Sequence, residues 1–480
     1  MSLRQIIGWC AWCALVLAAL AAVAPTASIA KPGELDRTFG KRGRVEAKID
    51  RLTPARVHLA TAADGSIVAT RGDVVLRYGP NGDLDPRFGE AGKLTVTAVE
   101  GLPFMLTDVA FDAEGRVLVF GTATDPSITR EIPGYVPIRV NPSFAVVMRF
   151  DATGKLDSGF GDGDGIVRSS LGFQPFSTYT GGIPLASIDS ARLDSAGRIV
   201  MAIGELGLPP SEGHPHFGWV TDALARLMPS GDLDPTFGGG DGIADDLLSR
   251  QMIYSDFCIS TGDEPVIASS SFSIYSEYSA DPYEPTSPQT SWLTRLRGDG
   301  SLDPAFGMGG SAYVRGGSGP LTCEDSGRLI MLQQPDFQPP DRSPFRAWKI
   351  VRASASGRVD RRFGDQGRAI VKQPDNGSPE LASVAVDSRG RVLLAGSVAV
   401  PKRSGRSPRA FLTVIRLLPS GKPDRRFGRG GWIRTDLGQR TDVSADDIAI
   451  DMSGRLLIGG RVRSGQSQPD AVVLARYLTR

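Results

Sequence analysis

Short runs in which apolar and polar residues alternate recur along this 480-residue chain, and they predict β-strands. In one recurring segment such a run ends in Asp-x-x-Gly-Arg and a second apolar run follows, as at 109–121, 384–396 and 448–460. A period of two on both sides of a short glycine turn is typical of a β-hairpin. We name its two strands a and b.

A second recurring segment is an apolar strand c that ends in Arg and is followed by the motif Gly-x-Leu-Asp-x-x-Phe-Gly, which we expect to form strand d. The motif Asp follows the Arg by eight residues, a spacing that fits a hairpin with a three-residue loop such as 80–82. In that register Arg and Asp face each other across the ladder. The structural pairs predicted in this way are Arg77–Asp85, Arg149–Asp157, Arg226–Asp234, Arg295–Asp303, Arg352–Asp360 and Arg416–Asp424.

The motif occurs seven times, with insertions of variable length between its copies. Each unit supplies strands a to d, and four-stranded antiparallel units arranged in a ring form a β-propeller. The chain begins with a lone motif at 33–40 and ends with a lone strand c at 471–478. We therefore predict an all-β, seven-bladed propeller that is closed by the N-terminal strand d pairing with the C-terminal strand c, with Arg476 across from Asp36. Within the motif copy at 231–238 we expect Leu233 to pack inward and Phe237 to fill the space between blades.

The repeated pattern Gly-x-Leu-Asp-x-x-Phe-Gly-x-x-Gly, together with Asp-x-x-Gly-Arg, resembles the bacterial delta-60 repeat family. The resemblance covers 33–478 and implies a β-propeller that is distantly similar to NHL-type propellers. It implies no particular activity. Two copies depart from the pattern by one extra residue before the last glycine, at 160–165 and 237–242, and another has Pro423 in place of the leucine.

The N-terminus predicts export. A basic Arg4, an apolar run over 6–23 and small residues before Ala30 form a secretory signal over 1–30, with cleavage after Ala30 or, as the second choice, Ala27. An uncleaved membrane anchor is the alternative, and the shortness of the apolar run disfavours it. Residues 31–480 then form one propeller domain in the periplasm, the cell envelope or the extracellular space, and we expect it to be a monomer.

Charge adds no specific partner to this picture. Without residues 1–30, the chain has 53 basic and 53 acidic residues, and this balance supports neither nucleic acid nor an anionic membrane as a partner. No later segment is apolar enough to cross a bilayer.

The sequence indicates no catalytic residue, metal or cofactor. Asp162 and Asp164 alternate as calcium ligands do, but no further acid follows, so a turn is the favoured interpretation. His214 and His216 are weak candidates, because no third metal ligand is nearby in the sequence. The motif aspartates recur seven times and each has an Arg partner, which favours a structural role.

Two cysteines remain after cleavage, Cys258 and Cys323, near the ends of strand a in neighbouring units. Such positions approach each other only near the propeller axis. A disulfide and two buried thiols are equally compatible with the sequence.

The long connections all fall between strands b and c or between d and a, which leave the same face of an up-and-down propeller. The segment 271–291 is the richest in aromatic side chains, with Phe272, Tyr275, Tyr278 and Tyr283. Such residues bind proteins and sugars, although this segment could also be a flap over its own blade. The favoured hypothesis is an exported binding or scaffold module for a protein or glycan of the envelope or the extracellular space. The alternatives are a hydrolase or lyase with a site in the central cavity, or a purely structural envelope protein.

Overall fold

The computed structural model describes most of the chain after the N-terminal segment. The described residues form strands and turns, and among them no helix is long and apolar enough to cross a membrane. They are residues 31–49, 55–132, 138–169, 186–207, 218–245, 247, 252–271, 290–333, 347–372, 378–400, 409–438, 442–463 and 470–480.

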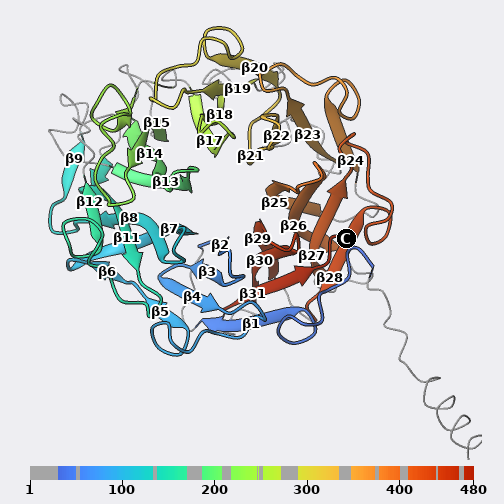
Figure 1. The fold of residues 1–480 in the computed structure, drawn as a ribbon, viewed down its shortest axis with the longest axis horizontal. Helices are drawn as coiled ribbons and strands as arrows, with labels where there is room; N and C mark the ends of the chain where they lie inside the picture. The colour runs from blue at the N-terminus through green and yellow to red at the C-terminus, as the bar shows by residue number, and fades with distance from the viewer. Residues whose placement is uncertain are drawn as a thin grey trace, which may run out of the picture.

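Seven antiparallel sheets stand around a central axis in chain order, which confirms the predicted seven-bladed propeller (Figure 1). We number the blades I to VII by their inner strands a, which are β2 (Val57–Thr61), β7 (Leu102–Phe111), β13 (Ala186–Leu193), β17 (Met252–Ile259), β21 (Leu321–Cys323), β25 (Ser378–Val386) and β29 (Asp442–Ile450). The strands b are β3 (Ile67–Arg71), β8 (Val117–Thr124), β14 (Ile199–Gly207), β18 (Pro265–Ser271), β22 (Leu329–Gln333), β26 (Val392–Val400) and β30 (Leu456–Arg463).

Strands c and d complete each blade toward the outside. The strands c are β4 (Val74–Tyr78), β11 (Ser143–Phe150), β15 (Gly218–Leu227), β19 (Thr290–Arg295), β23 (Ala347–Ala353), β27 (Arg409–Leu417) and β31 (Asp470–Tyr477). The outer strands d are β5 (Lys93–Thr95), β12 (Ile166–Ser169), β16 (Ile243–Ala244), β20 (Ser311–Arg315), β24 (Arg368–Lys372), β28 (Trp432–Asp436) and, for blade VII, β1 (Arg44–Ile49). Blade II also carries the short strand β6 (Ala98–Val99), and β9 (Arg130–Ile132) pairs with β10 (Ile138–Val140).

Antiparallel order fixes where the connections lie. The a–b and c–d connections leave one edge of every sheet, which we call the turn edge. The b–c and d–a connections leave the opposite edge, which we call the loop edge.

The two ends of the chain close the ring as predicted. Strand β1 pairs with β31 through the whole of its length, from Arg44 opposite Ala475 to Ile49 opposite Asp470. The last blade is therefore built from both ends of the chain, which ties the N-terminal segment to the C-terminal strand.

The prediction that the motif itself forms strand d is wrong. Only one bridge per blade, such as Leu35 with Tyr477, continues the ladder into the motif, and the outer strand begins after the motif ends. The reason is the motif aspartate, which accepts hydrogen bonds from residues two positions later, as Asp36 does from the Thr38 backbone N–H at 3.0 Å. This Asx-type turn ends the extended conformation.

In six of the seven blades a buried or largely buried arginine connects the blade to the next one. In six blades the Nε atom of the strand c arginine donates to the motif aspartate at 2.7–3.0 Å, and its Nη1 atom donates to a turn carbonyl of the following blade at 2.5–2.8 Å. In these six blades the guanidinium lies over the motif phenylalanine, 4.2–4.9 Å from the ring centre. We call this set of arginine, aspartate, phenylalanine and neighbouring carbonyl the interblade clip.

The glycines of the motif permit the close approach of neighbouring blades. In all seven blades the N–H of the glycine after the motif phenylalanine donates to a carbonyl of the next c–d turn, as Gly161 does to Ser230 at 2.8 Å. The first motif glycine sits in that turn. Gly231 has a φ of +103°, and a Cβ there would lie 2.7 Å from Val167 Cγ2 and 2.9 Å from Gly161 N, so the position requires glycine.

Blade I carries an incomplete clip. Arg77 lies 3.6 Å from Asp85 and 5.9 Å from the centre of the Phe88 ring, and its Nε and Nη1 atoms make no hydrogen bond in the described part of the chain. The exposed Arg87 takes the Asp85 carboxylate instead, with Nε to Oδ1 at 3.0 Å. The first of the seven predicted Arg–Asp pairs is thus a long contact, whereas the other six are direct.

The side chains of the motif lie on both sides of the outer wall, with the phenylalanines inside and the leucine of blade III outside. The seven motif phenylalanines are fully buried, and Phe237 packs against the c–d turn of blade IV. The prediction that Leu233 packs inward is wrong, because its side chain is 38% exposed at the outer wall. The hydrophobic core continues from blade to blade, and one cluster joins Phe160 of blade II with Ala186 of blade III.

Removal of a complete clip should destabilise the propeller much more than removal of the incomplete one. We expect Arg226→Met to lower the free energy of unfolding by about 3 kcal/mol, because it removes the direct partner of the buried Asp234 carboxylate and leaves it only Arg198, 3.8 Å away. Arg77→Met should cost about 1–2 kcal/mol, because only packing against Phe88 and Phe111 is lost. Urea unfolding followed by intrinsic fluorescence measures both, and equal losses would contradict the clip.

Acid should weaken the clips. Burial alone would raise the pKa of Asp36, but hydrogen bonds from Thr38 and the charges of Arg476 and Arg455 outweigh it and hold that pKa below its ordinary value. A lowered pKa in the folded state stabilises the protein above the pKa of the unfolded chain, about 3.9, and this contribution is lost as the pH falls through the folded value.

We therefore expect the urea midpoint of the wild type to fall between pH 5 and pH 2, and to fall less in Asp36→Asn, which has one such carboxyl fewer. The exposed Asp365 lies outside the clips, so Asp365→Asn should keep the wild-type pH dependence. The same acid sensitivity in Asp36→Asn and the wild type would exclude this carboxyl as a source of acid lability.

Candidate functional site

The inner strands carry a set of polar residues at one repeated position, four residues before the Asp of the a–b turn or its equivalent. Five of these strands have a β-bulge just before this position, at residues 106–108, 188–190, 254–256, 381–383 and 445–447. A bulge re-aims the following side chain, and here it does so at the strand nearest the axis. The residues at this position in blades I to VII are His58, Asp108, Ser190, Asp256, Pro320, Ser383 and Asp447.

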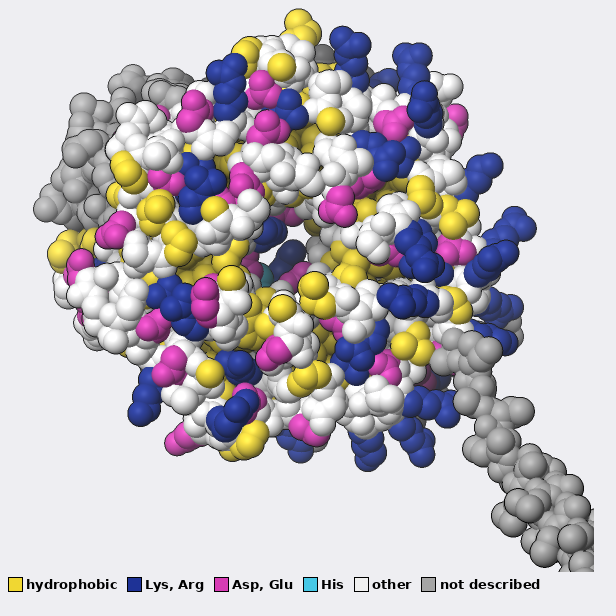
Figure 2. All heavy atoms as spheres, viewed as in Figure 1, with side chains coloured by type: hydrophobic (Ala, Val, Ile, Leu, Met, Phe, Trp, Pro, Cys, Tyr) yellow, Lys and Arg dark blue, Asp and Glu magenta, His cyan; other side chains and the backbone are white. Residues whose placement is uncertain are grey.

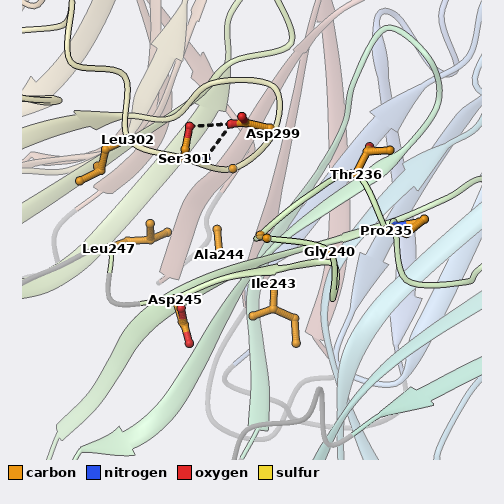
Figure 3. Close-up of a pocket in the computed structure, with 13 residues that line it drawn as sticks. Pro235, Thr236, Gly240, Ile243, Ala244, Asp245, Leu247, Asp299, Ser301 and Leu302 are labelled. Carbon is orange, nitrogen blue, oxygen red and sulfur yellow. Dashed lines mark hydrogen bonds between the residues drawn. The ribbon is translucent and has the colours of Figure 1, made fainter.

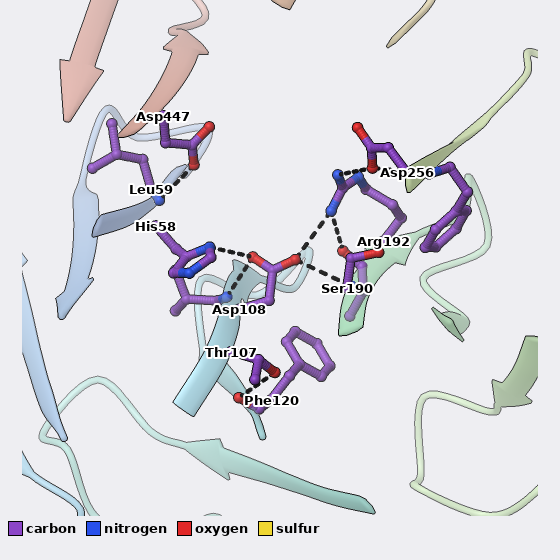
Figure 4. A network of polar contacts seen from close by, with 12 residues as sticks. His58, Leu59, Thr107, Asp108, Phe120, Ser190, Arg192, Asp256 and Asp447 are labelled. Carbon is purple, nitrogen blue, oxygen red and sulfur yellow. Dashed lines mark hydrogen bonds and ion pairs between the residues drawn. The ribbon is translucent and has the colours of Figure 1, made fainter. Parts of the chain in front are cut away.

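The three aspartates of this set link inner strands of adjacent blades (Figure 4). Asp108 accepts a hydrogen bond from the backbone N–H of Ala191 at 3.1 Å. Asp256 and Asp447 accept equivalent bonds from the N–H groups of Leu321 and Leu59, both at 2.9 Å. Each carboxylate also accepts the N–H of the residue that follows it, at 2.7–2.8 Å. These bonds hold the carboxylates in fixed positions around the axis.

The side chains of Arg192 and His58 lie between these carboxylates. Arg192 donates from Nη1 to Asp108 at 3.0 Å and from Nη2 to Asp256 at 3.2 Å. The His58 Nδ1 atom lies 3.8 Å from Asp108 Oδ1. We call His58, Asp108, Arg192, Asp256 and Asp447 the axial cluster. Figure 2 shows the opening at the centre of the disk, with charged side chains inside it.

Burial controls the electrostatics of the axial cluster. It raises the pKa of Asp256 although Arg192 acts in the opposite direction, and it raises the pKa of Asp447 although His58 opposes it. Burial alone would lower the pKa of Arg192, but the charges of Asp256 and Asp108 outweigh it and raise that pKa. A carboxyl with a raised pKa beside an imidazole is a pair that can exchange a proton with a ligand.

Most of the candidate binding residues lie outside the described part of the chain. These are Phe272, Tyr275, Tyr278 and Tyr283 of the 271–291 segment, together with His214 and His216.

The calcium candidates are placed in a turn. Asp164 Oδ1 accepts the backbone N–H of Ile166 at 2.8 Å, and Asp162 is exposed. Within the described ranges, no group of three or more His, Cys, Asp or Glu side chains is arranged to hold a metal ion.

Cys258 and Cys323 form a disulfide, which decides between the two possibilities that the sequence left open. It joins β17 of blade IV to β21 of blade V, with a Cα–Cα distance of 5.7 Å. The bridge lies on the inner strands, where equivalent positions of adjacent blades approach each other. Because β21 is only three residues long, the bridge adds a covalent link where the inner strand offers few hydrogen bonds.

A groove at the outer wall separates the motif of blade III from the c–d turn of blade IV (Figure 3). Its wall includes Pro235, Thr236, Ile243, Asp299 and Leu302. Asp299 already accepts hydrogen bonds from Ser301 (backbone N–H at 2.9 Å, hydroxyl at 2.7 Å). The groove therefore offers few free polar groups, and the axial cluster is the better candidate for chemistry.

The axial cluster was missed in the sequence because its residues differ from blade to blade. Its signal is positional: His58, Asp108, Asp256 and Asp447 lie four residues before the first residue of the a–b turn, so aligning the seven units on that turn would have brought these four into one column, with Arg192 two positions further on.

Comparison with known proteins supports the fold. A family model described as "Domain of unknown function (DUF5122) beta-propeller" matches residues 218–237, which hold β15 and most of the blade III motif. None of the curated proteins compared with the chain matches it.

Several solved structures resemble the chain at low identity. A streptogramin B lyase has 9% identity and a TM-score of 0.43, with 90% of this chain and 97% of that chain covered. The PQQ-bound aldose sugar dehydrogenase of Streptomyces coelicolor has 11% identity and a TM-score of 0.37, with coverage of 93% and 100%. Drosophila Plexin A in complex with Semaphorin 1b has 8% identity and a TM-score of 0.39, with coverage of 93% and 88%. At these values the likenesses carry no argument about what this chain binds or catalyses.

Proposed function

We propose that this chain is an exported, monomeric propeller of the delta-60 repeat type that acts as a binding or scaffold module for an envelope or extracellular protein or glycan. The observation that carries the proposal is the use of the repeated residues. The clip arginines, aspartates and phenylalanines are buried and engaged between blades, so they are not available to a partner. What differs from blade to blade is the set of connections at the loop edge.

Export is supported by two independent features. The N-terminal 30 residues have the composition of a secretory signal. The Cys258–Cys323 disulfide is typical of proteins that fold in an oxidising compartment.

The loop edge is the proposed binding face. Six of the seven b–c connections are long, and the connection between β18 and β19 carries the aromatic residues Phe272, Tyr275, Tyr278 and Tyr283. A rigid ring of blades holds the ends of these connections at fixed positions, which is how other propellers and sandwiches build binding faces.

Partner capture tests this proposal. Residues 31–480, which contain all seven blades, serve as bait for envelope extract and for a glycan array. We expect a specific partner for the wild type and its loss when 272–289 is replaced by a short Gly-Ser linker, because the aromatic contacts are removed.

The matched control replaces the equivalent connection of blade V, residues 334–346, by the same linker and should retain the partner. Equal capture by all three proteins would exclude the aromatic connection, and no specific partner for the wild type would favour a purely structural protein.

The axial cluster supports a second candidate function, a hydrolase or lyase acting in the channel. The specific observation is the raised pKa of the Asp447 carboxyl next to the His58 imidazole. Against it stand the backbone hydrogen bonds that already occupy the carboxylates.

Panels of nitrophenyl glycosides and uronic-acid polysaccharides test the second candidate. Turnover that falls at least about 100-fold in Asp447→Asn, and little in the exposed Asp365→Asn, would support it. Absence of turnover in the wild type would leave the cluster with its role in joining blades.

A further inference from the structure

Positive charge is concentrated on one sector of the propeller, although the chain as a whole is nearly neutral. The segments that follow the clip aspartates in blades V, VI and VII (361–372, 425–436 and 37–49) contain thirteen Lys and Arg against three Asp and Glu. The matching segments of blades II, III and IV (158–169, 235–245 and 304–315) contain two Lys and Arg against four Asp. Figure 2 shows the Lys and Arg side chains along the edge of the disk over β24, β28 and β1.

Many of these cations are free to bind a partner. They are exposed, and in the part of the chain that the structure describes they make no ion pair or side-chain hydrogen bond. We call this set the basic rim; its members are Arg37, Lys41, Arg42, Arg361, Arg362, Lys422, Arg425, Arg426 and Arg429.

The clips hold the basic rim in a fixed arrangement. Arg361 and Arg362 follow Asp360, whose carboxylate binds Arg352 at 3.0 Å, and Arg425 and Arg426 follow Asp424 in the same way. The cations therefore repeat from blade to blade on rigid turns at the turn edge. Unpaired like charges at fixed positions repel one another, and an anionic surface would relieve that repulsion.

The N-terminal end of the propeller lies inside the basic rim. The carbonyl of Pro32 accepts the N–H of Gly428 at 3.2 Å, and Gly33 lies against Ile433 of β28. The apolar segment 6–23 precedes this point by only a few residues in the sequence. The rim is therefore the part of the propeller that lies nearest in the sequence to the predicted signal segment.

We infer that the basic rim is a docking surface for an anionic phospholipid membrane. Clustered Lys and Arg bind acidic headgroups by electrostatic attraction, and arginine binds phosphate oxygens through two parallel hydrogen bonds. A depression of about 1,020 Å³ in the same wall, lined by Lys41, Arg42 and Arg44 beside Glu46, Asp83 and Asp436, is large enough for a headgroup.

This orientation is compatible with the proposed binding face but does not depend on it. The rim lies at the turn edge, and the b–c and d–a connections leave the opposite edge of each sheet. A propeller docked by its rim would therefore leave the loop edge uncovered by lipid. Failure of partner capture would leave the membrane inference standing, and the reverse also holds.

Vesicle binding tests the inference. Residues 31–480 are incubated with vesicles of phosphatidylcholine containing 30% phosphatidylglycerol, and with vesicles of phosphatidylcholine alone, and bound protein is measured by flotation. We expect binding to the acidic vesicles only, with loss at high salt because the attraction is screened. The variant Arg361→Gln, Arg362→Gln, Arg425→Gln, Arg426→Gln should bind at least about 100-fold more weakly, since the four basic residues contribute separately.

The control variant removes the same charge elsewhere on the surface: Arg56→Gln, Lys155→Gln, Arg297→Gln, Arg315→Gln. It should bind as the wild type does, and equal thermal midpoints of the three proteins would show that each is folded. Equal weakening in both variants would show that net charge and not the rim is responsible, and would overturn the inference. Rim-dependent binding of heparin without any binding to acidic vesicles would also overturn it, in favour of a soluble polyanionic chain.

Discussion

The buried arginine at the end of each strand c is the interaction on which the propeller depends. A guanidinium removed from water is unfavourable unless its donors are bonded, and here an aspartate of the same blade and a carbonyl of the next blade both accept from it. The phenylalanine beneath it adds a cation–π contact. Because one side chain meets both blades, every clip sets the position of the neighbouring sheet. The ring closes only when the last clip, Arg476, reaches Asp36 and the turn of blade I.

The sequence predicted the number of blades, the hairpin register and the closure, because these follow from local periodicity and from a spacing of eight residues that leaves one possible pairing. It failed where a side chain overrides the pattern. Leu35 and Phe39 would lie on the same face of an extended strand. The hydrogen bond from the Thr38 N–H to the Asp36 carboxylate instead turns the chain between them. Leu233 was assigned inward because it is apolar, but its place on the outer wall depends on the neighbouring blade, which no local pattern contains.

The axial cluster shows that the sequence pattern also fails to predict a candidate functional site. Its members are His, Asp and Arg in different blades, and a β-bulge sets the direction of the three aspartates, so no repeated residue type and no simple periodicity marks them. The bonds from Asp108, Asp256 and Asp447 to backbone N–H groups of adjacent blades show that the cluster contributes to the joints of the inner wall. Arg192 and His58 are the members that differ from a purely structural arrangement, because they bring a guanidinium and an imidazole close to the carboxylates.

The clip also explains how one propeller can carry a basic rim on blades V to VII and weakly charged motif segments on blades II to IV. Once aspartate, phenylalanine and glycine hold the motif, the two residues after the aspartate can change without loss of the joint. Blade III has Pro235-Thr236 there, whereas blade VI has Arg425-Arg426. The clip bond from arginine to aspartate is 2.7 Å in blade III and 2.9 Å in blade VI, so the difference of two charges at these positions has little effect on it. Blade I shows where a substitution after the aspartate does disturb the clip, because Arg87 at the second position competes with Arg77 for Asp85. Charge on the rim is therefore tolerated by the fold only while it points away from the clip.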